Sequence, residues 1–165
     1  MFWIIVRDTI KRILYFVNTL YMLSSFFHHS TFNKIGFDDV YFSIISPDSN
    51  IILINTLIIE EQNILIKNTI PSDVEERIIN DSLLLYEPKT IILYGKNCID
   101  STMESKYNQL IQLGYLRNSL FIYYGGLFEW CLLQDVYGDN NFPTTNQVID
   151  FFKYKPDSLF KKKLK

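Results

Sequence analysis

Three short, uninterrupted apolar runs constrain the fold of this chain more than any other feature of its sequence. They are Ile51–Ile54, Ile91–Tyr94 and Leu120–Tyr123. Runs of this length, rich in β-branched and aromatic residues, are typical of strands that are buried on both faces of a sheet. The three runs therefore predict the central strands of a buried sheet.

Helical patterns follow these runs, and two of them begin with a start signal. Ser72 with Glu75, and Ser101 with Glu104, have the spacing of a capping box. Apolar residues then recur at helical spacing, and Gly114 is placed to end the second helix. The predicted helices span about 73–84, 101–113 and 127–136, while 37–45 is interpreted as a helix or a strand and 64–66 as a short strand.

Strands that alternate with helices in this order predict an α/β fold, with a central parallel sheet and helices on both faces. The length of 165 residues suits one domain with a core of its own. We divide the chain into an N-terminal amphipathic helical segment (1–36), a main domain (37–153) and a basic C-terminal tail (154–165).

The N-terminal segment up to His29 is rich in apolar residues but is not uniformly apolar. On a helical wheel Arg7 and Lys11 share one edge, and Trp3 and Val17 lie opposite them. The longest apolar run is far shorter than the about 20 residues that a bilayer span needs. We expect a helix that packs on its own domain or on a partner. Peripheral membrane contact through residues 1–29 is the alternative, and a membrane span is a third possibility.

Charge and cysteine content exclude several classes of function. The net charge of −2 and a pI near 5.7 provide no basic field for nucleic-acid binding. Cys98 and Cys131 form neither a disulfide framework nor a metal-ligand pattern, which favours a reducing, intracellular and most simply cytoplasmic location. The adjacent His28 and His29 also lack other ligand residues nearby, so the sequence predicts no metal and no other cofactor.

A ligand site in a parallel sheet is expected at the carboxyl ends of the strands, where a loop leads into a helix. The loop from Gly95 to Ser101 occupies that place after the second apolar run. It consists of Gly95, Lys96, Asn97, Cys98, Ile99, Asp100 and Ser101.

Residues around this loop resemble a known family. The run Thr90–Gly95, the helix that ends at Gln112–Gly114, and the stretch Ser119–Trp130 with its Gly-Gly pair look like the C-terminal half of a rhodanese domain. In that family a strand runs into the catalytic loop, and the next strand ends in Gly-Gly followed shortly by Trp. The segment Leu133–Thr145 also resembles an extension of rhodanese-like proteins from large DNA viruses and some protists.

The resemblance also shows where the family's chemistry is missing. Rhodanese domains carry a nucleophilic cysteine directly after the strand, and this chain has Gly95 there. They often carry an arginine near the end of the loop, where this chain has Asp100, whose charge repels an anionic substrate. The resemblance therefore implies a catalytically inactive module that binds a partner, most simply a protein.

An enzyme remains the competing hypothesis. Cys98 lies three residues after Gly95 in the same loop, near a helix N-terminus and Lys96, which both favour a thiolate. A sulfurtransferase or thiol-redox enzyme could use Cys98 as a displaced nucleophile, although Asp100 opposes this. Cys131 and Trp130 are interpreted as core residues.

Overall fold

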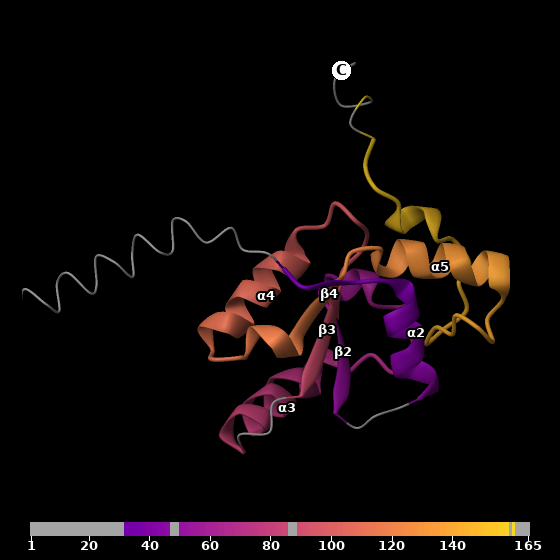
Figure 1. The fold of residues 1–165 in the computed structure, drawn as a ribbon. Helices are drawn as coiled ribbons and strands as arrows, with labels where there is room; N and C mark the ends of the chain where they lie inside the picture. Colours follow the sequence, from indigo (N-terminus) through magenta and orange to yellow (C-terminus); the bar gives the residue numbers. More distant parts are fainter. Residues whose placement is uncertain (1–31, 47–49, 86–88, 159, 161–165) are drawn as a thin grey trace, which may run out of the picture. The chain divides into compact units, whose positions relative to one another are not determined.

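The computed structural model describes residues 32–46, 50–85, 89–158 and 160, which belong to a unit that begins at Phe32 (Figure 1). The predicted N-terminal helix, its membrane alternative, the two histidines and the basic run after Phe160 lie outside the described residues. No described helix is both long enough and apolar enough to cross a bilayer.

The described residues form a four-stranded, fully parallel sheet in the order β1-β4-β3-β2. The strands are β1 (Lys34–Ile35), β2 (Ile51–Asn55), β3 (Thr90–Tyr94) and β4 (Leu120–Tyr123). The predicted runs form the three longer strands. In the register Asn55 lies beside Tyr94, and Tyr94 beside Tyr123, so these strands end at one common edge.

Helices cover both faces of the sheet, with α3 and α4 on one side and α2 and α5 on the other (Figure 1). The α-helices are α2 (Phe37–Ile45), α3 (Ser72–Leu84), α4 (Thr102–Gln112) and α5 (Gly126–Tyr137). Three short 3-10 helices connect them: η1 (Ile59–Glu61), η2 (Arg117–Ser119) and η3 (Phe152–Tyr154). The segment 37–45, which the sequence left open, is thus a helix.

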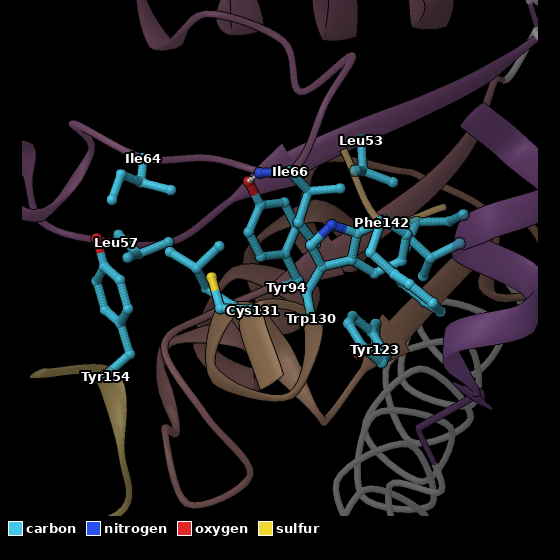
Figure 2. Packing of buried hydrophobic residues seen from close by; sticks show 13 residues of the cluster. Leu53, Leu57, Ile64, Ile66, Tyr94, Tyr123, Trp130, Cys131, Phe142 and Tyr154 are labelled. Carbon is cyan, nitrogen blue, oxygen red and sulfur yellow. Dashed lines mark hydrogen bonds between the residues drawn. The ribbon is translucent and has the colours of Figure 1, made fainter. Parts of the chain in front are cut away.

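Alternation along the strands divides the core into two layers. In β3, Ile91 and Leu93 pack toward α3 and α4, whereas Ile92 and Tyr94 pack toward α2 and α5. This follows from the period of two along a strand, which sends successive side chains to opposite faces. The layer against α2 and α5 is strongly aromatic and centres on Trp130, which is fully buried (Figure 2).

Two segment boundaries differ from the sequence division. Lys34 and Ile35, assigned to the N-terminal helical segment, form β1 and pair with β4. A two-residue edge strand has no apolar run that could reveal it. Tyr154, assigned to the basic tail, is fully buried against the α2–α5 layer. Its burial needs contacts with distant residues, so no local pattern indicates it.

The predicted strand at 64–66 is wrong. Ile66 makes a single isolated bridge to Thr144, although Ile64 and Ile66 are both buried. The segment instead bonds the chain near Thr144, for example from Lys67 N to Pro143 O at 3.1 Å. The three consecutive apolar residues thus reflect burial in a non-strand segment, which a short apolar run alone does not distinguish from a strand.

Neither predicted capping box forms, although both helices begin where expected. Ser72 is already the first helical residue, and the side chain of Ser101 makes no capping hydrogen bond. Glu75 pairs with Lys106 of α4, and Glu104 accepts a hydrogen bond from Tyr124. Both glutamates therefore make tertiary contacts that compete with the local motif.

We expect Tyr94→Phe to destabilise the domain. The Tyr94 hydroxyl lies 2.7 Å from Thr69 Oγ1 and accepts a hydrogen bond from the buried Ile66 N–H at 3.2 Å. Removing it leaves that N–H unpaired, at a cost of about 1–3 kcal/mol. Urea unfolding measures the loss. Tyr107→Phe is the control, because that buried hydroxyl has only a 3.5 Å contact with Arg117 O. Equal losses in both variants would contradict the role of Tyr94.

Candidate functional site

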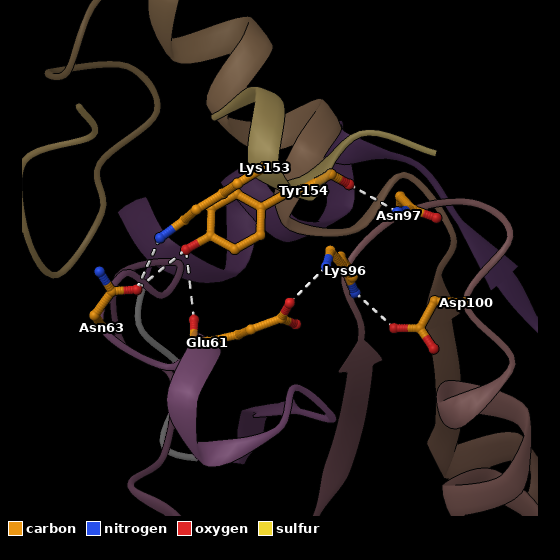
Figure 3. Close-up of polar contacts among 7 residues, drawn as sticks. All are labelled: Glu61, Asn63, Lys96, Asn97, Asp100, Lys153 and Tyr154. Carbon is orange, nitrogen blue, oxygen red and sulfur yellow. Dashed lines mark hydrogen bonds and ion pairs between the residues drawn. The ribbon is translucent and has the colours of Figure 1, made fainter. Parts of the chain in front are cut away.

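The loop Gly95–Ser101 joins β3 to α4 at the carboxyl edge of the sheet. Its position follows from β3, which is buried along its length from Ile91 to Tyr94 and so delivers Gly95 to a fixed place. Figure 3 shows the polar contacts that surround Lys96, Asn97 and Asp100 in this loop.

The Asp100 carboxylate turns back into the loop and accepts hydrogen bonds from the loop and from the start of α4. Oδ2 accepts a hydrogen bond from Lys96 N at 2.8 Å. Oδ1 accepts from Thr102 N at 2.9 Å and from the Thr102 hydroxyl at 2.6 Å. Backbone N–H groups at a loop and a helix N-terminus are the donors that bind anions in many proteins. In this chain the anion is supplied by the loop itself.

Gly95 and Asp100 fit each other sterically. A β-carbon at position 95 would lie 2.5 Å from Asp100 Oδ2 and 3.0 Å from Thr56 Oγ1. A carbon–oxygen separation of 2.5 Å is well inside van der Waals contact, so any larger residue at position 95 must displace the carboxylate. The carboxylate therefore occupies the space that a side chain at this position would use.

The start of α5 packs directly on the loop. Leu127 N donates to Gly95 O at 2.9 Å, and Phe128 N donates to Lys96 O at 3.0 Å. Gly126 makes this approach possible, because it has φ +62° and its β-carbon would lie 2.6 Å from Gly95 O. The Gly-Gly pair noted in the sequence is thus required at its second position by close contact with the loop.

Two longer contacts join the loop to distant parts of the chain. Lys96 forms an ion pair with Glu61, with Nζ and Oε1 2.5 Å apart (Figure 3). Asn97, which is nearly fully buried, donates from Nδ2 to Tyr154 O at 2.7 Å. Glu61 and Tyr154 were missed by sequence reasoning, because each is brought to the loop only by folding.

The remaining loop residues face outward. Cys98 is exposed, and Ile99 is 59% exposed at the tip of a turn closed by Asp100 N and Asn97 O. Cys131, by contrast, lies in the core, where burial raises the pKa of its thiol to about 12. Of these two cysteines, only Cys98 is therefore open to a reagent in the folded protein.

A cavity of about 410 Å³ lies beside the loop and is lined by equal numbers of cations and carboxylates. These charged residues are Lys96, Lys153, Lys155, Glu61, Asp100 and Asp157. Such a lining has no net charge to concentrate a small anion. Within the described part of the chain, no group of three or more His, Cys, Asp or Glu is arranged to hold a metal ion.

Comparison with known proteins supports the fold. The BH2092 protein from Bacillus halodurans has a TM-score of 0.54 and 17% identity, over 90% of this chain and 97% of that chain. The predicted architecture, an α/β fold with a central parallel sheet covered by helices on both faces, is confirmed. At this identity the likeness establishes the fold alone.

Two further solved structures have lower scores. The Alr3790 protein from Anabaena sp. has a TM-score of 0.48 and 17% identity, over 72% of this chain and 84% of that chain. The As-Sb reductase from Leishmania major has a TM-score of 0.48 and 16% identity, over 66% of this chain and 81% of that chain. No family model and no curated protein matches the chain.

Asp100→Ala should create an anion site in the loop. The substitution frees Lys96 N, Thr102 N and the Thr102 hydroxyl beside the vacant space at Gly95. A bound anion at 100 times its Kd raises the free energy of unfolding by about 2.7 kcal/mol. Thermal unfolding with and without thiosulfate measures this gain.

The matched control is Asp38→Ala, which makes the same change in net charge at an exposed position of α2. Wild type and Asp38→Ala should show only the general effect of the salt. An equal response of all three proteins would contradict the role assigned to the Asp100 carboxylate.

Proposed function

We propose that this chain is a rhodanese-like domain that does not transfer sulfur and acts by binding a protein partner at its loop edge. The observation that carries the proposal is the Asp100 carboxylate. It takes the loop donors and the space beside Gly95 that a thiolate nucleophile and an anionic substrate would need.

The chemistry of sulfur transfer argues against the usual reaction at position 95. Sulfur transfer requires a thiolate that attacks the sulfane sulfur of thiosulfate, with sulfite as the leaving group, to form a persulfide. Glycine offers no atom for that bond. A carboxylate already inside the loop also repels both the incoming anion and a persulfide anion.

Cys98 is the alternative nucleophile, and its exposure favours access by a reagent. The position of Cys98 in the loop, however, does not favour catalysis. The Lys96 N–H points to Asp100, and the turn closed by Asn97 O and Asp100 N presents Cys98 to solvent. A thiolate is stabilised by hydrogen-bond donors gathered around the sulfur, and here the loop N–H groups of Lys96, Ile99 and Asp100 donate to oxygen atoms of Asn97 and Asp100 instead.

The purified wild-type protein should form thiocyanate from thiosulfate and cyanide no faster than the uncatalysed reaction. The reason is that Gly95 has no thiol, and the loop does not stabilise a thiolate at Cys98. Cys98→Ser should give the same trace as wild type. Thiocyanate production in wild type that disappears in Cys98→Ser would establish the enzyme in place of the binding module. Circular dichroism of both proteins provides the control for folding.

The surface proposed for the partner surrounds the 410 Å³ cavity. Ile58 and Ile99 line it and are 61% and 59% exposed. Exposed apolar side chains next to a recess that has balanced charges are typical of a protein-binding surface with an apolar centre and a polar rim. The balanced charges also favour a protein over nucleic acid, whose phosphates need an excess of cations.

Replacing Ile58 and Ile99 together by Glu should abolish partner binding, because two charges would have to be buried at the contact. The measurement is quantitative affinity capture from an extract of the source cells. The control is Leu84→Glu with Leu85→Glu, which changes two exposed leucines at the end of α3. The proposal requires a protein retained by wild type and the control and lost from the loop variant. Retention by all three places the contact elsewhere.

A further inference from the structure

A second recess lies at the same sheet edge, between the N-terminal ends of α3 and α4. Its volume is about 560 Å³, within the range of about 300–1,000 Å³ that is usual for small-molecule sites. Most of its lining residues carry a hydroxyl or amide group, including Asn55, Thr56, Ser72, Ser101, Ser105 and Gln109. We call this recess the hydroxyl groove.

Asn55 supplies an unused donor to the hydroxyl groove. It is the last residue of β2 and only 7% exposed. Its Oδ1 accepts a hydrogen bond from Leu57 N at 3.2 Å, which fixes the orientation of the amide and directs Nδ2 away from that contact. Among the described residues Nδ2 has no acceptor, and Asn55 lines the groove. Nδ2 is not itself fully buried, so it is accessible to water from the groove, and an incoming acceptor can take the place of that water.

The charges at the groove are already paired within the protein. Lys106 lies in an ion pair with Glu75, joining α4 to α3 across the groove wall. At the start of α4, the N–H of Thr102 is bound by the Asp100 carboxylate. An anion would therefore meet carboxylates beside both helix ends, and a cation would find no free carboxylate in the lining.

The hydroxyl contact between Thr56 and Thr102 separates the groove from the loop. Their Oγ1 atoms are 2.7 Å apart. The Thr102 hydroxyl donates to the Asp100 carboxylate, and the Thr56 hydroxyl also donates to Tyr94 O at 3.3 Å, so the single Thr56 hydrogen is shared between Tyr94 O and Thr102. Thr56 and Thr102 line both the hydroxyl groove and the cavity beside the loop, so these hydrogen bonds mark the boundary between the two. The groove therefore stands as a site of its own.

We propose that the hydroxyl groove binds a small uncharged ligand whose carbonyl or hydroxyl oxygen accepts a hydrogen bond from Asn55 Nδ2. Ligands of this chemistry are amides and polyols. The surrounding hydroxyl and amide groups donate or accept as such a ligand requires. The site goes beyond the binding function proposed for the loop and does not depend on whether the loop is catalytic.

The test is a titration of the full-length, isotopically labelled protein followed by NMR. Acetamide and myo-inositol are the neutral probes, and acetate is the charged counterpart of acetamide. We expect saturable shifts of the Asn55 side-chain amide and of the Ser101 and Thr102 backbone amides with a neutral probe. The neutral probe that binds more tightly, acetamide or myo-inositol, identifies the ligand class as amide or polyol. Shifts with acetate alone, or with none of the probes, overturn the proposal.

Asn55→Asp is the matched variant. It keeps an Oδ1 that accepts from Leu57 N, replaces the free donor by an acceptor and adds one negative charge. Binding of the neutral probe should weaken at least tenfold, which corresponds to about 1.4 kcal/mol. Asn108→Asp makes the same change at an exposed position of α4 outside the groove lining and should bind like wild type. Unchanged affinity in Asn55→Asp overturns the assignment of the donor, whatever the result for sulfur transfer.

Discussion

Strand β3 is buried on both faces, and the position of everything at the carboxyl edge follows from this. Its neighbours β2 and β4 run parallel to it, so Asn55, Tyr94 and Tyr123 lie side by side at one edge. Each strand then leads into a different loop. The packing of the core thus brings together loops that are far apart in the sequence, and both proposed sites lie where they meet.

The loop after β3 contains its own anion. Gly95 leaves room for the Asp100 carboxylate, and the carboxylate satisfies Lys96 N and the start of α4. The two residues are therefore sterically complementary, since a β-carbon at position 95 would meet the Asp100 carboxylate. Gly126 keeps α5 in direct contact with the same loop.

The loop edge and the hydroxyl groove share a boundary at Thr56 and Thr102 but differ in character. The loop edge combines exposed apolar side chains with balanced charges, which suits a protein surface. The groove has an accessible amide donor and many hydroxyl-bearing residues in its lining, which suits a small neutral molecule. Because Thr56 lines the groove and its hydroxyl contacts that of Thr102, which donates to Asp100, a ligand in the groove would contact hydrogen bonds that continue into the loop.

The sequence by itself determined the three main strands, the helices that follow them and the place of the loop, because strand and helix periodicities are local properties of the chain. Through a resemblance to rhodanese domains it also predicted that Gly95 and Asp100 stand where such domains carry their chemistry. Only the tertiary structure decided that the Asp100 carboxylate turns inward, that Glu75 and Glu104 leave their capping boxes, and that Tyr154 and Asn55 serve the two sites. Glu75, Glu104 and Tyr154 meet partners that lie 20 or more residues away, and sequence spacing carries no information about such partners. The partners of Asp100 and Asn55 are near in the sequence, but the orientation of these two side chains depends on how the folded loops present the donors.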